Sequence, residues 1–182
     1  EIIALQETWD TSEGLFLEGY QSFFIPALAS PRGRPSGGLL TLIALGLNCV
    51  VMPVFQKSSH LQVLQLKFSH NFGFILLNIY NVPSQLHLLL LPPLIRAVLS
   101  SKLAQEATGY ILLGDFNFHP CGKDCQVFTT EDLAVMCHFP HTRVGDCFNS
   151  LCCDFNLNNC YNIGLQDNIP NTFVGRGSLS TI

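Results

Sequence analysis

The sequence predicts a layered domain of the α/β or α+β class, in which strands and helices share one hydrophobic core. Three observations predict it: a length of 182 residues, a composition that is 48% hydrophobic and only 12% charged, and short apolar runs interspersed with segments of helical spacing. One globule of this length buries roughly 70% of its unfolded surface, so it needs no disulfide or metal to fold. The low charge and high apolar content exclude disorder. We therefore expect a single domain over residues 1–182.

The predicted strands are short apolar runs that end in polar residues. Three segments have the length and composition of buried strands: Ile2 to Leu5, Phe74 to Tyr80, and Tyr110 to Leu113. A longer apolar stretch, Leu39 to Phe55, is interrupted by glycine, asparagine and proline and is shorter than the ~18 residues of a membrane span. It predicts two buried strands, or a strand and a turn.

Two helices are predicted. The leucine-rich stretch Leu86 to Ile95 contains Pro92 and Pro93, and this pair bars a continuous spanning helix. Pro93 suits the first turn of a helix that continues through apolar residues at helical spacing to Leu103. A weak capping pattern over 129–132 predicts a second, short helix that ends near residue 136.

Charge and cysteine content restrict the partners and the compartment. Nine basic residues against 13 acidic ones give a net charge of −4, which excludes a polybasic coat for DNA. The eight cysteines lack the spacing of a disulfide framework, so we expect reduced thiols in an intracellular protein, nuclear or cytoplasmic and not secreted. No signal-peptide pattern opens the chain, and we expect no membrane partner.

Polar side chains follow the three predicted buried strands. Glu7 comes directly after the first strand, and the alternation of side chains along the second places Asn78 and Tyr80 on one face. Asp115 and Asn117 repeat this arrangement after the third strand, where the preceding glycine allows a close backbone approach. Mg²⁺ is typically held by one or two carboxylates with waters and a substrate phosphate, so Glu7 and Asp115 suit it better than they suit zinc.

Two other groups of residues could carry chemistry. Arg34 lies in a flexible loop before a strand and could contact a phosphate, although such a loop is more often a solvated connection; it lacks the Gly-Lys-Ser/Thr of an ATP-binding loop. The cysteines and histidines between Cys121 and Cys160 could form a zinc site, but they lack a second properly spaced pair. We interpret them as ordinary thiols.

Four motifs carry a family resemblance by their order and spacing. They are Leu5 to Trp9 (LQETW), Arg32 to Leu39 (RGRPSGGL), Asn78 to Pro83 (NIYNVP) and Leu113 to Asn117 (LGDFN). In combination they resemble the endonuclease/exonuclease/phosphatase superfamily, and within it the apurinic-like endonuclease domain of non-LTR (LINE-type) retrotransposons. The resemblance covers nearly the whole chain and is weakest between Pro120 and Asn168.

The resemblance implies a role for each matched residue. Glu7 resembles the metal-binding glutamate, and Tyr80 resembles the tyrosine that hydrogen-bonds the scissile phosphate. Asp115 resembles the aspartate that orients or deprotonates the attacking water, and Asn117 resembles the asparagine that contacts the phosphate. Thr172 resembles a family threonine near the DNA backbone.

The resemblance also implies a fold, a reaction and partners. The implied fold is a four-layered sandwich of two packed β-sheets flanked by helices, incomplete in this chain. The implied activity is nicking of DNA with Mg²⁺ or Mn²⁺, which primes reverse transcription by another domain of the same polyprotein. We expect Asn78, Thr172 and Arg34 to contact the substrate.

The chain departs from the family pattern at both ends. The family's first strand, with a metal-site asparagine, would precede Glu1, and its next aspartate and a Ser-Asp-His motif would follow Ile182. Because catalytic groups act as a cooperative unit, we expect the isolated chain to be close to inactive in plasmid nicking. Two alternatives stay open: a catalytically dead remnant of a mobile element, and a phosphatase or lipid phosphodiesterase of the same superfamily.

Overall fold

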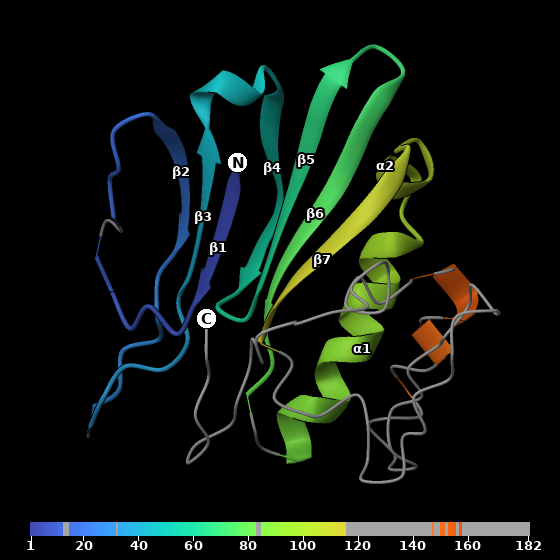
Figure 1. Cartoon of the computed structure of the whole chain (residues 1–182). Helices are drawn as coiled ribbons and strands as arrows, with labels where there is room; N and C mark the ends of the chain where they lie inside the picture. Colours follow the sequence, from blue (N-terminus) through green and yellow to red (C-terminus); the bar gives the residue numbers. More distant parts are fainter. Residues whose placement is uncertain are drawn as a thin grey trace, which may run out of the picture. The chain divides into compact units, whose positions relative to one another are not determined.

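The computed structural model describes residues 1–12, 15–31, 33–82 and 85–115, together with 147, 150, 151, 153–155 and 157 (Figure 1). Side chains are described except at 55–57 and 85–90. The chain, for which the sequence predicts a single domain, divides into two compact units, Glu1–Phe116 and Asn117–Ile182. In the second unit, Cys147, Ser150, Leu151 and 153–155 are helical. The candidate site lies in the first unit.

The first unit contains two β-sheets (Figure 1). The three-stranded sheet has the order β1-β3-β2 and is antiparallel; its strands are β1 (Ile2–Gln6), β2 (Tyr20–Ile25) and β3 (Leu39–Ala44). The four-stranded sheet has the order β4-β5-β6-β7; its strands are β4 (Val50–Ser58), β5 (Leu61–Ser69), β6 (Phe72–Tyr80) and β7 (Gly109–Asp115). The β6–β7 pair is parallel and the others are antiparallel. A 3₁₀ turn, Leu45–Leu47, precedes β4.

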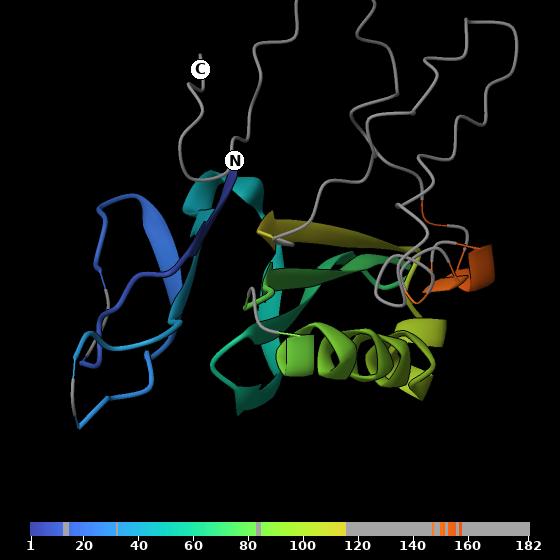
Figure 2. The same cartoon turned by 90° about the horizontal axis from the view of Figure 1, so that it is seen from below.

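The two sheets pack face to face, which confirms the predicted α+β sandwich. The apolar core between them contains Ile43 of β3 and Leu64, Leu66 and Leu76 of the four-stranded sheet. Side chains that alternate with these on β6 point to the other face, where Leu77 is fully buried. Helix α1 (Gln85–Leu99) lies against the four-stranded sheet, and α2 (Lys102–Gln105) follows it (Figure 2). Residues 1–115 therefore supply three layers, namely two sheets and one layer of helix.

The predicted strands are present, but three of them, all at sheet edges, are less buried than expected; β7, with the predicted segment Tyr110 to Leu113, is only half-buried. β1, at the edge of its sheet, is only half-buried, with Leu5 40% exposed. In the stretch Leu39 to Phe55, β3 is buried as predicted, whereas Val50 of β4 is 63% exposed because β4 is also an edge strand. Strands β2 and β5 were not predicted from the sequence.

Helix α1 begins before the position that the sequence predicts. Pro92 and Pro93 lie inside the helix and not at its start, so the prediction of a helix that begins at Pro93 was wrong. A proline in a helix interior costs about 3 kcal/mol, because it removes a hydrogen bond and crowds the preceding turn. Burial of the large apolar side chains of α1, such as Ile95 and Leu99, offsets this cost at about 2 kcal/mol for each one.

Two further predictions concern the thiols and the membrane. Among the described cysteines, Cys49, Cys147 and Cys153 are free thiols. None of the helices in the described part of the chain is both long and apolar enough to cross a membrane. The short helix predicted over 129–136 and most of the cysteine-rich stretch lie outside the described residues.

Candidate active site

A buried polar network joins the two sheets and leads to the site. Asn78 of β6 is 1% exposed, and its side-chain Oδ1 accepts a hydrogen bond of 2.8 Å from Gln6 Nε2 of β1. Its Nδ2 donates to Leu40 O at 3.2 Å and to Thr41 Oγ1 at 3.1 Å, both on β3. These bonds fix how β1 and β3 lie across β6.

The network continues on the neighbouring strand of the four-stranded sheet. Gln62 of β5 stands directly opposite Asn78 in the β5–β6 ladder. The Thr41 hydroxyl donates to Gln62 Oε1, and Gln62 Nε2 donates to Phe23 O of β2 at 2.9 Å. Because a buried amide without partners costs about 1–3 kcal/mol, these matched bonds favour one relative placement of the sheets.

One step further along the same strands, two predicted site residues meet. The Tyr80 hydroxyl, at the end of β6, donates a hydrogen bond to Glu7 Oε1, just beyond the end of β1. Tyr80 is 5% exposed and Glu7 is half-buried. The prediction that Asn78 and Tyr80 share a face is confirmed. Asn78 bonds to Leu40 of β3, and Tyr80 bonds to Glu7, which directly follows β1 of the same sheet.

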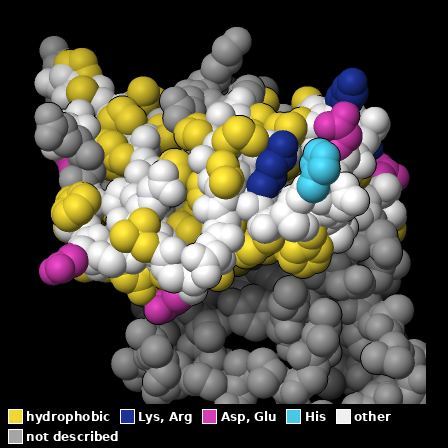
Figure 3. Space-filling view, turned by 90° about the horizontal axis from the view of Figure 1, so that it is seen from above, with side chains coloured by type: hydrophobic (Ala, Val, Ile, Leu, Met, Phe, Trp, Pro, Cys, Tyr) yellow, Lys and Arg dark blue, Asp and Glu magenta, His cyan; other side chains and the backbone are white. Residues whose placement is uncertain are grey.

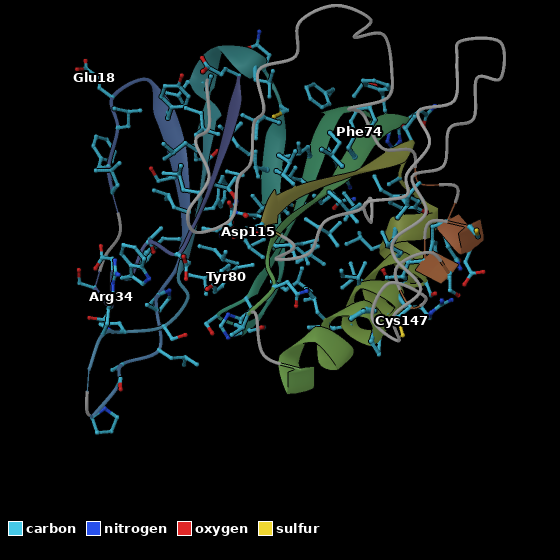
Figure 4. All side chains as sticks on the ribbon, turned by 60° about the horizontal axis from the view of Figure 1, so that its bottom comes forward. Glu18, Arg34, Phe74, Tyr80, Asp115 and Cys147 are labelled. Atoms are coloured by element: carbon cyan, nitrogen blue, oxygen red, sulfur yellow. The ribbon has the colours of Figure 1, made fainter. Side chains whose placement is uncertain are left out.

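Asp115 lies beside Tyr80. The parallel β6–β7 ladder pairs Tyr80 with Asp115, and paired residues in such a ladder point to the same face of a sheet. The backbone confirms the close approach expected at Gly114 (φ +141), because a Cβ there would overlap the carbonyl oxygen of Ile79. Asn81 N donates to Asp115 O at 2.8 Å and extends the contact beyond the ladder. Figure 4 shows Tyr80 and Asp115 next to each other.

The backbone around Glu7 adopts an unusual conformation. Glu7 and Trp9 have φ angles of +52° and +53°, the left-handed region that side chains other than glycine rarely occupy. Each such residue costs of order 1–2 kcal/mol. Strain of this kind persists where surrounding contacts fix it, and it is concentrated at functional sites.

Asn78 occupies a structural position. Its amide is buried and bonded to Gln6, Leu40 and Thr41, so its donors and acceptor are used within the protein. This does not fit the substrate contact predicted for it. The reason is that both residues lie on the face of β6 that the other sheet covers. Tyr80 is at the end of the strand, whereas Asn78 lies two residues further inside the interface between the sheets.

The other predicted site residues are placed differently or lie outside the described residues. Arg34 is exposed and its guanidinium stacks over the ring of Trp9, which draws the loop toward the segment that follows β1. Figure 4 shows Arg34 on this outer loop, away from Tyr80 and Asp115. Asn117 and Thr172 lie outside the described residues.

His60 is a neighbour of Tyr80 that sequence analysis missed. Its ring centroid lies 5.7 Å from that of Tyr80, and its carbonyl accepts the Tyr80 N–H at 2.9 Å. With Ser58, Val82 and two leucines of α1, the two rings line a half-open, mainly apolar pocket of about 250 Å³. A lone histidine in a hairpin turn gives no signal in the sequence, because its relation to Tyr80 exists only in three dimensions.

The donors at this end of the sheets fit a hard divalent cation. Glu7 accepts the hydrogen bond of the Tyr80 hydroxyl and Asp115 is paired with Tyr80 in the β6–β7 ladder, and Mg²⁺ is typically held by one or two carboxylates and several waters. Among the described residues, no group of three or more His, Cys, Asp or Glu side chains is placed to hold a metal. Carboxylate oxygens are donors that Mg²⁺ prefers, whereas structural zinc sites are built mainly from Cys and His.

The opposite end of the sheets differs in character. Figure 3 shows that hydrophobic side chains are exposed there, between scattered Lys, Arg, His, Asp and Glu side chains. The polar groups of the interface lie toward the end of the first unit at which Glu7, Tyr80 and Asp115 are found. Comparison of the chain with known protein families gives no matching family model, and comparison with curated proteins gives no match.

Proposed function

We propose that this protein is a Mg²⁺-dependent phosphodiesterase that nicks DNA. The observation that carries the proposal is that Tyr80 bonds to Glu7 and is paired with Asp115, although the three residues are far apart in the sequence. Their chemistry also supports it, since two carboxylates and a phenol provide the oxygen ligands and the hydrogen-bond donor that a phosphodiester requires.

Each of the three side chains has a distinct task in this proposal. Glu7 holds the cation and also orients the Tyr80 hydroxyl, with which it shares a hydrogen bond. Tyr80 donates a hydrogen bond to a phosphate oxygen once its hydroxyl is turned toward the substrate. Asp115, at the end of β7 beside Tyr80, provides the second carboxylate for the cation and accepts a proton from the attacking water or orients it.

The bound Mg²⁺ would supply neutralisation of charge on the phosphoryl oxygens. The chain supplies positioning, because the β6–β7 ladder and the polar network between the sheets hold Tyr80 and Asp115 in place before substrate arrives. The resemblance to retrotransposon endonucleases extends the proposal to a partner, a reverse transcriptase domain of the same polyprotein, which would extend the 3′-hydroxyl at the nick.

Cation binding tests the proposal directly. Electron paramagnetic resonance measures Mn²⁺ binding to the chain and to the variants Glu7→Gln and Asp115→Asn. Loss of a residue that merely supports a ligand costs 10–100-fold in metal affinity, so removal of a ligand is expected to cost at least ~10-fold. Glu18→Gln is the matched control, because Glu18 is exposed and Figure 4 shows it away from Tyr80.

Plasmid nicking provides the second readout. Any Mg²⁺-dependent conversion of supercoiled to open-circular plasmid is expected to be weak and to disappear in Glu7→Gln, while Glu18→Gln retains it. Affinity for Mn²⁺ that is the same in all four proteins, or nicking that persists in Glu7→Gln, would contradict the proposal. Thermal unfolding of each variant shows that the comparison is made between folded proteins.

A further inference from the structure

The loop between β2 and β3 contacts the segment that carries Glu7. Two consecutive carbonyls of this loop accept backbone hydrogen bonds from the residues that follow Glu7: Trp9 N donates to Gly37 O at 3.2 Å, and Thr8 N donates to Gly38 O at 3.3 Å. Glu7 and Trp9, which flank Thr8, both have left-handed backbones, which among the described non-glycine residues only Asn48 shares. The loop therefore holds the chain in the strained turn that directs Glu7 toward Tyr80.

The same loop also contacts the residue that packs on Tyr80. A Cβ at Gly37 would lie 3.0 Å from both Cε1 and Nδ1 of the His60 imidazole and 3.1 Å from the carbonyl oxygen of Ser59. These distances are shorter than ordinary van der Waals contacts, so a side chain at position 37 would displace the imidazole. The hydrogen atom of glycine leaves the His60 ring in its place against Tyr80.

We propose that Gly37 and His60 are positioning residues of the Glu7–Tyr80 pair. Gly37 has one function toward each member of the pair: its carbonyl fixes the turn after Glu7, and its lack of a side chain lets His60 pack against Tyr80. The RGRPSGGL loop thereby acts through its glycines on the geometry of the site, in addition to any phosphate contact by Arg34. This inference rests on the proposed function, because a positioning residue needs a site to position. The contact of Gly37 with His60 can nevertheless be tested in the metal-free protein.

A double-mutant cycle with Mn²⁺ as the probe tests the proposal. Gly37→Ala and His60→Ala are each expected to lower Mn²⁺ affinity about 10-fold, the loss typical of groups that orient metal ligands. The double variant is expected to be no weaker than His60→Ala alone, because the added methyl group acts by displacing a ring that is no longer there. Effects that multiply would overturn the proposal.

Gly19→Ala is the matched control for backbone strain. Gly19 has a φ of +83°, close to the +76° of Gly37, but a Cβ there would meet no atom within 4 Å. Both variants should lower the melting temperature, because alanine is strained at either position, and Gly37→Ala should lower it more, because only there does the methyl group also crowd His60 and Ser59. Only Gly37→Ala should weaken Mn²⁺ binding, and an equal loss in Gly19→Ala would assign the effect to stability alone.

The aromatic signals of the metal-free protein separate this inference from the proposed function. Ring-proton shifts of Tyr80 and His60, measured by NMR, should move in Gly37→Ala and stay unchanged in Gly19→Ala. If the parent chain binds no Mn²⁺ but these shifts move as expected, the proposed function fails and the positioning contact stands. If the shifts are the same in both variants, the positioning proposal fails whatever the metal does.

Discussion

The interface between the two sheets has two halves that differ in chemistry. Along β5 and β6, cross-strand pairs change from Leu64–Leu76 to Gln62–Asn78, and Tyr80 follows at the end of the strand. We call the first region, with Ile43 and Leu66, the apolar half, and the second, with Gln6 and Thr41, the polar half. The polar half is the one that lies next to the candidate site.

The difference suggests separate tasks for the two halves. Apolar burial is strong but non-directional, so it stabilises contact between the sheets without fixing how they are placed. Partial burial beside the apolar half also raises the pKa of the Cys49 thiol, because removal from water disfavours the thiolate. Hydrogen bonds of the polar half are directional, and they set the position of β1 relative to β6, on which the Glu7–Tyr80 contact depends.

The largest expected effect on stability is in the apolar half. Leu76 is fully buried, and Leu76→Ala should lower the free energy of unfolding by about 3 kcal/mol, from lost transfer energy and the cavity that remains. Urea unfolding followed by circular dichroism measures this. Leu45→Ala is the control, since that side chain is 65% exposed and its loss should change little.

The comparison requires that Leu76→Ala leave the site intact. Its Mn²⁺ affinity, measured under conditions where it is folded, should stay within about 2-fold of the parent, because the removed groups lie outside the network that places Glu7. A much larger loss of affinity would mean that the apolar half also positions the site, and the division into two tasks would be wrong.

A smaller loss of stability is expected in the polar half. Asn78→Ala leaves the partners of the amide, among them Gln6, without their hydrogen bonds and should cost about 2 kcal/mol. The same variant should weaken Mn²⁺ binding more than Leu76→Ala does, although it destabilises the fold less. Equal affinity in the two variants would remove the distinction between the halves.

A partner of Asn78 provides the internal control. Gln6→Ala removes the donor to Asn78 Oδ1, so its cost and that of Asn78→Ala should be less than additive in the double variant. Additive costs would show that the 2.8 Å contact between these side chains contributes nothing to holding β1 on β6.

The pattern of apolar and polar residues along each strand explains which strands could be predicted from the sequence. In β6 the residues from Phe74 to Ile79 are apolar except for Asn78, so the strand was recognisable, and the alternation of side chains then placed Asn78 and Tyr80 on one face. In β5, Gln62 and Gln65 lie on opposite faces. They interrupt the apolar residues on both faces of the strand, which explains why this central strand was missed. Local periodicity reveals a strand but not the partner that makes a buried glutamine favourable.

Tertiary contacts explain the other errors. From the sequence alone, the prolines of α1 indicate the start of a helix. The structure places them inside the helix, because burial of its apolar face against the sheet offsets their cost. Asn78 was assigned to the substrate because the sequence places it on the same face as Tyr80, without showing how far the opposite sheet extends over that face. The contact between Gly37 and His60 joins two turns from different sheets, and no local pattern indicates it.

The smallest expected effect concerns a contact outside both halves. Arg34 stacks on Trp9, but both side chains are exposed, and a cation–π contact at such a position contributes only about 0.5 kcal/mol. Arg34→Ala should therefore leave the urea midpoint almost unchanged. Because Trp9 is the only tryptophan of the chain, its fluorescence reports the loss of the stack directly.

Two substitutions at position 34 separate the stack from stability. Arg34→Lys keeps the charge but removes the planar guanidinium, so its fluorescence should change in the same direction as that of Arg34→Ala. If either variant lost as much stability as Asn78→Ala, the loop would belong to the structural interface, and the polar half would have to be extended to include it. If the emission did not change, the Arg34–Trp9 contact would be absent in solution, and the turn after Glu7 would depend on the backbone bonds to Gly37 and Gly38 alone.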